Sequence, residues 1–144
     1  HVTEIGHDMT LPTPDLRPDR EWQGQRFVYN QAEGAEWQNF RLPGFICRDT
    51  TIGANTKGVA GVQVVRKGHG DSPFASHDTD ILFTFVMSGQ VILHGEGREP
   101  YSLEPGDAFV IPPGMMTRLS DASDDLELLE VSLPGTFTTT LETT

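Results

Sequence analysis

Short runs of β-branched and aromatic residues, separated by turn residues, dominate the chain from Gln25 onward. Gly, Pro, Asn or Asp interrupts these runs about every eight to twelve residues, which is typical of an all-β sandwich or barrel. No segment offers a convincing helix of about ten residues or more. The runs predicted to be strands are 26–29, 44–48, 58–66, 81–87, 91–94, 98–103, 108–111, 117–120 and 126–133.

The N-terminal segment differs from the rest of the chain. In residues 1–24, Pro12, Pro14 and Pro18 stand among charged residues, and no steady hydrophobic period appears. At 144 residues the whole chain has the size of one domain with a single core. We therefore expect an extended N-terminal arm or leader over residues 1–24 and a single barrel domain over residues 25–144.

Charge and hydropathy limit the partners and the compartment. Ten Lys and Arg oppose 21 Asp and Glu, and the resulting formal charge of −11 repels phosphate backbones and anionic membranes. The longest apolar run, 81–87, is far shorter than the roughly 20 residues of a membrane-spanning helix, and no leader pattern opens the chain. The single cysteine, Cys47, cannot form an internal disulfide, and we interpret it as a small buried hydrophobe rather than a nucleophile. We expect a cytoplasmic protein with no nucleic-acid or membrane partner.

The turn residues predict where strands end. Ser88-Gly89 joins two apolar runs and predicts a tight hairpin with a positive φ at Gly89. Residues 104–107, Glu-Pro-Gly-Asp, place Pro and Gly where a type II turn needs them. Pro112 and Pro113 end the run before them, because neither offers an N–H to a strand ladder.

One segment has the spacing of a known motif. In SLEPGDAFVIPPGMMTR, five residues separate Gly106 from Pro112, one separates Pro112 from Gly114, and two separate Gly114 from Thr117. This spacing resembles the second sequence motif of the cupins.

A second segment supports the same resemblance. His77, Leu82 and Gly89 match the second half of the first cupin motif, and the 16 residues 90–105 separate the two motifs. The tract SDDLELLEVSLPG is similar to the closing strand of small single-domain bacterial cupins. The resemblance extends over residues 68–133 and implies a double-stranded β-helix, a jelly roll closed into a barrel whose mouth holds the site.

The resemblance also implies where a metal would be bound. Cupins commonly use two histidines and an acidic residue from the first motif and a histidine from the second. These four positions hold Ala75, His77, Leu82 and Thr117 in this chain. A lone imidazole does not hold a divalent ion, because such protein sites use three or four ligands. We therefore predict no metal or other cofactor, and a degenerate metal site.

A relocated metal site is the alternative. His77 with Asp80, plus His94 or His69, would make a set of two histidines and one carboxylate for a divalent transition metal. Asp80 lies near the strand entrance, and His69 and His94 lie beside Gly residues where solvated histidines are common. This pattern favours ordinary surface histidines.

The predicted ligand pocket follows from strand alternation. Leu82, Thr84 and Val86 share one face of their strand and would line the pocket with the residues at the other three motif positions. Arg66 and Arg118 flank this region, where they would meet an anionic ligand group or form surface ion pairs.

Two functions remain open from the sequence. The first is a metal-free cupin-type module that binds a small and partly apolar molecule. The second is an enzyme, either a metal-dependent dioxygenase or isomerase with relocated ligands, or a metal-free acid-base catalyst centred on His77. His77 alternatively makes a hydrogen bond to a backbone carbonyl or to Thr117. Small cupins commonly pair as homodimers, and residues 10–30 would suit an exchanged strand.

Overall fold

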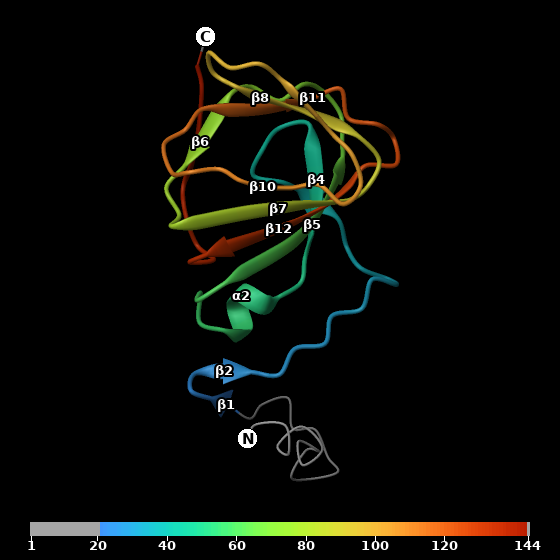
Figure 1. The fold of residues 1–144 in the computed structure, drawn as a ribbon. Coiled ribbons are helices and arrows are strands. Elements are labelled where there is room, and N and C mark those ends of the chain that lie inside the picture. Colours follow the sequence, from blue (N-terminus) through green and yellow to red (C-terminus); the bar gives the residue numbers. More distant parts are fainter. Residues whose placement is uncertain (1–20, 144) are drawn as a thin grey trace, which may run out of the picture.

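The computed structural model describes residues 21–143 and is almost entirely β-structure. Residues 1–20 of the expected arm lie outside the described residues. Two sheets face each other, with β7 and β12 on the lower side and β8 and β11 on the upper side of Figure 1. The order of the six-stranded sheet is β10 (Ala108–Val110), β7 (Ile81–Ser88), β12 (Glu127–Leu133), β5 (Gly61–Lys67), β4 (Phe45–Asp49), β3 (Gln38–Asn39). The order of the five-stranded sheet is β13 (Thr139–Leu141), β6 (Ala75–His77), β11 (Thr117–Ser120), β8 (Val91–Gly95), β9 (Tyr101–Leu103).

The core lies between the two sheets and follows from strand alternation. Leu128 on β12 is paired with Val65 on β5 and Val86 on β7, so these three side chains share the inner face. All three are almost fully buried. Leu119 on β11 and Val91 on β8 belong to the same core cluster from the opposite sheet. This two-layer arrangement is a jelly roll, as the resemblance implied.

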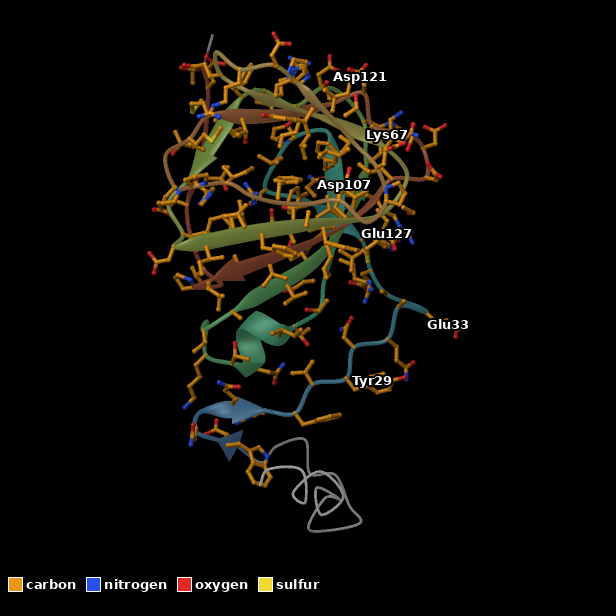
Figure 2. All side chains as sticks on the ribbon, in the orientation of Figure 1. Tyr29, Glu33, Lys67, Asp107, Asp121 and Glu127 are labelled. Carbon is orange, nitrogen blue, oxygen red and sulfur yellow. The ribbon has the colours of Figure 1, made fainter. Side chains whose placement is uncertain are left out.

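A short hairpin and a connecting segment lie outside the barrel. β1 (Glu21–Trp22) pairs with β2 (Gln25–Arg26), and residues 27–37 lead from there to the barrel. Figure 2 shows Tyr29 and Glu33 on this connecting segment, away from both sheets. Tyr29 is 75% exposed.

Alternation and turn chemistry located the longer strands. The run predicted over 81–87 is the strand β7, and 117–120 is β11. The strands that sequence reasoning missed, β1, β3 and β6, have only two or three residues, too few to show a period. The run predicted over 58–66 begins later, because residues 52–55 form the four-residue helix α2 and a turn follows it.

No helix among the described residues is long and apolar enough to cross a membrane.

The predicted hairpin at Ser88-Gly89 was wrong in one respect. The turn is present, and Gly89 has a φ of +77°. However, β7 and β8 do not pair with each other, because β7 belongs to the six-stranded sheet and β8 to the five-stranded sheet. The turn therefore carries the chain from one layer to the other. A local turn signal identifies the bend but not the partner of each strand, which is set by distant segments.

Candidate functional site

The register places the four motif positions around one small cavity. Thr117 on β11 is directly paired with Ala75 on β6, and His77 lies two residues further along the same strand and face. Leu82 and Thr84 reach the cavity from β7 in the opposite sheet. This inner cavity has a volume of about 30 Å³, which holds one or two water molecules but no larger ligand.

Both ring nitrogens of His77 are engaged with backbone groups. The Thr79 N–H donates to Nδ1 at 3.2 Å, so Nδ1 carries no proton. Nε2 therefore carries the proton and donates to the carbonyl oxygen of Ile111 at 2.6 Å. The side chain is buried, and it leaves no free lone pair for a metal and no free basic nitrogen for proton transfer. His77 thus ties β6 to the segment that follows β10.

The other three motif positions offer no strong metal ligand. Ala75 and Leu82 have hydrocarbon side chains, and Thr117 has a neutral hydroxyl. Among residues 21–143, no group of three or more His, Cys, Asp or Glu is placed to hold a metal ion.

The residues of the alternative metal set lie apart from the inner cavity. His69 and Asp80 are exposed, in the loop after β5 and just before β7. Nε2 of His94 lies 2.6 Å from the Ser120 hydroxyl, in a cross-strand contact between β8 and β11 of the five-stranded sheet. None of these three residues lines the inner cavity.

Three further residues of the predicted pocket differ in their placement. Val86 packs in the core and does not line the cavity. Arg66 is on the surface, where its guanidinium contacts Glu127 at 2.9 Å and lies over the Trp37 ring. Arg118, in contrast, lines the inner cavity.

An ion pair between the partly buried Arg41 and the buried Glu130 lies beside this cavity and was not anticipated from the sequence. Nη2 of Arg41 donates to Oε1 of Glu130 at 2.5 Å, and Nε donates to Oε2 at 3.2 Å. The two side chains are only 20% and 8% exposed. Glu130 shares the inner face of its sheet with its two cross-strand partners, Gln63 on β5 and Thr84 on β7. Thr84 lines the inner cavity, and Gln63 lines a second cavity on the other side of the pair. The bidentate geometry is the strong form of an Arg–carboxylate contact.

Aromatic rings and a hydroxyl hold the Arg41 guanidinium in place. Its central carbon lies 5.1 Å from the Phe40 ring centroid and 5.3 Å from that of Phe137, within the range of a cation–π contact. Nη1 donates to the Thr139 hydroxyl at 3.3 Å. The Phe137 ring also makes an edge contact with the His77 ring, with 6.1 Å between centroids. Arg41 therefore links the β3–β4 connection to the C-terminal segment.

A larger cavity lies on the other side of the Arg41–Glu130 pair. This outer cavity has a volume of about 540 Å³, in the range of small-molecule sites. Both charged side chains line both cavities, so the pair lies between them. The outer cavity is lined by Gln38, Asn39, Arg41, Cys47, Gly61, Gln63, Glu130, Ser132, Gly135, Thr136, Phe137 and Thr139.

Cys47 lies in the wall of the outer cavity but is not set up as a nucleophile. It is 2% exposed, and its thiol is 3.7 Å from the Asn39 carbonyl oxygen. Burial raises the pKa of the thiol, a hydrogen bond with Gln38 opposes this, and the carboxylates of Asp49 and Glu130 add to the increase. The thiol form therefore predominates at neutral pH, and only the thiolate is strongly nucleophilic.

The sequence held a signal for Glu130 that was not used. In LELLEVSL, Leu128, Glu130 and Ser132 have the same alternation parity, and all three are buried on the inner face. A charged residue on the buried parity of a strand is a candidate site residue, because burial of an unpaired charge is costly. Arg41 gave no such signal, since it lies in an irregular connection between β3 and β4.

The comparisons with known proteins agree with this architecture. A family model described as "Cupin domain" matches residues 61–132, which is half of the chain. Among curated proteins, none matches the sequence.

Several solved structures share the fold at low sequence identity. The polyketide cyclase RemF from Streptomyces resistomycificus has a TM-score of 0.67 at 14% identity, with 82% of this chain and 87% of that chain covered. KdgF from Halomonas sp. has a TM-score of 0.56 at 20% identity, with 74% and 94% covered. A cupin-superfamily sugar phosphate isomerase from Silicibacter pomeroyi has a TM-score of 0.60 at 19% identity, with 81% and 82% covered. Such identities establish the fold alone.

Proposed function

The chain belongs to the cupin family, and on that basis we propose that it binds a small molecule in its barrel without a metal at the family's usual ligand positions. The binding centre in this proposal is the Arg41–Glu130 pair rather than His77. The two backbone hydrogen bonds of His77 support this choice, because they occupy the only imidazole at the four motif positions.

The single observation that carries the proposal is the burial of the Arg41–Glu130 pair between the inner and outer cavities. A buried ion pair is a poor source of stability, since the cost of removing two charges from water offsets most of their attraction. Hydrophobic side chains of similar volume would fill the same space at no greater cost. Charged groups that are buried and still line a cavity of about 540 Å³ are therefore better explained as ligand-contacting groups.

The metal content of the purified protein is the first measurement. We expect far less than one equivalent of Fe, Mn, Ni or Zn per chain after dialysis without chelator, because Ala75, Leu82 and Thr117 cannot replace the missing ligands. Elemental analysis gives the result directly. A content near one equivalent would contradict the metal-free proposal.

Ligand binding is the second measurement. A screen of chemically diverse fragments by protein NMR in the presence of EDTA should give hits whose chemical-shift changes centre on Arg41, Gln63 and Thr139. Gln63→Trp should abolish these hits, because the larger side chain occupies the part of the outer cavity beside the Arg41–Glu130 pair. Val62→Trp is the matched control, since Val62 is the neighbouring residue on β5 and does not line the outer cavity. Hits that require added metal, or that map elsewhere, would refute the proposal.

A further inference from the structure

The charge of the outer cavity restricts the ligand. Arg41 and Glu130 are the charged residues of its wall, and they neutralise each other in the bidentate pair. An anionic ligand would compete with Glu130 for the guanidinium and would also meet the field of a chain with a net charge of −11. A cationic ligand finds no free carboxylate, because both Glu130 oxygens already accept from Arg41. An uncharged ligand is the one that leaves the pair intact.

The hydrogen-bonding groups of the wall restrict the ligand further. Gln38 and Gln63 contribute amides, and Ser132, Thr136 and Thr139 contribute hydroxyls. Amides and hydroxyls each offer both donors and acceptors. A ligand with several hydroxyl groups matches such a wall, since each hydroxyl also donates and accepts. Apolar side chains are few here, unlike in the inner cavity, where hydrophobic residues predominate.

We propose that the outer cavity binds an uncharged polyhydroxylated molecule of about the size of one sugar ring, such as a monosaccharide or cyclitol. This inference rests on the proposed function and specifies its ligand class. The volume of about 540 Å³ accommodates one such ring. Gln63 is central to the recognition, because it is paired with Glu130 across β5 and β12 and lies beside the ion pair.

The test compares neutral sugars with their anionic counterparts. The neutral probes are D-glucose, D-galactose, D-mannose, D-xylose, L-rhamnose and myo-inositol, and the anionic probes are D-glucuronate, D-galacturonate and D-glucose 6-phosphate. NMR titration of the full chain should show at least one neutral probe binding, and every anionic probe binding about tenfold more weakly than that neutral probe or not at all. Gln63→Leu should weaken neutral binding by about tenfold through loss of the amide.

Two further variants make the result specific. Thr136→Val removes a hydroxyl at an exposed position in the wall of the outer cavity, and it should also weaken neutral binding. Gln90→Leu makes the same amide-to-leucine change at an exposed residue outside the outer cavity and should leave binding unchanged.

The outcomes separate this inference from the proposed function. Tighter or equal binding of an anionic probe would overturn the ligand class and leave the binding function standing. Failure of every neutral probe, or unchanged binding in both Gln63→Leu and Thr136→Val, would also overturn the ligand class. If the fragment screen finds hits in the outer cavity in those cases, the proposed function survives. If that screen finds none, both fail.

Discussion

Replacing Arg41 with Met should lower the free energy of unfolding by about 3 to 5 kcal/mol. The reason is that the Glu130 carboxylate, which is 8% exposed, would remain buried but would no longer have the Arg41 guanidinium as its ion-pair partner. Its two oxygens would then lack the donors that Nε and Nη2 of Arg41 now supply. Urea unfolding followed by far-UV circular dichroism measures the change, with an unaltered m-value as the sign that the folded state is otherwise intact.

The double variant Arg41→Met with Glu130→Leu should recover most of that loss. It removes both charges and fills their space with hydrocarbon, and such replacements of a buried pair are often neutral or stabilising. The comparison therefore distinguishes the cost of an unpaired carboxylate from the net value of the pair. A double variant as unstable as the single one would show instead that the pair stabilises the fold, and the functional explanation of its burial would lose its main support.

A surface ion pair provides the matched control. Lys67 contacts Asp124 at 3.1 Å, with side-chain exposures of 43% and 99%. Lys67→Met makes the same kind of charge removal, but water solvates the remaining carboxylate. We expect a loss of about 0 to 1 kcal/mol. Figure 2 places Lys67 at the same end of the barrel as Asp107, Asp121 and Glu127.

The sequence predicted the barrel because local patterns encode most of it. The alternation of buried Leu82, Thr84 and Val86 with half-buried Phe83 and Phe85 is visible in the letters and present in β7. Which strands pair is a different kind of information, because β7 contacts β12 and β10 rather than its neighbour in sequence, β8. The cupin resemblance implied a jelly roll, but the predicted pairing of β7 with β8 was still wrong, because neither periodicity nor a turn signal specifies strand partners.

The candidate site was predictable only in part, for the same reason. The positions of Ala75, His77, Leu82 and Thr117 around one cavity depend on strand register, which motif spacing carries. The Arg41–Glu130 contact joins residues 89 positions apart, one of them in an irregular connection. No pattern in a single sequence pairs such residues. The polar centre of the barrel therefore became evident only from the folded structure.

Gly89→Ala should lower the free energy of unfolding by about 2 to 5 kcal/mol, and thermal and urea unfolding measure it. Two costs combine at this position. The φ of +77° is strained for any residue with a Cβ, and the added Cβ would lie 2.6 Å from the backbone N and Cα of Leu126. Backbone atoms cannot move aside as a flexible side chain would, and the neighbouring Leu126 is itself a fully buried core residue.

Gly97→Ala separates those two costs. Gly97 has a similar φ of +71°, but an added Cβ there meets no atom within 4 Å. The decrease in the free energy of unfolding of Gly97→Ala should therefore come from the backbone strain alone, about 1 to 2 kcal/mol. The difference between the two variants isolates the close approach between the β7–β8 turn and the segment that leads into β12. Equal losses would mean that Gly89 is needed only for its φ. The motif glycine would then not serve to bring these two segments into contact where the chain crosses between the sheets.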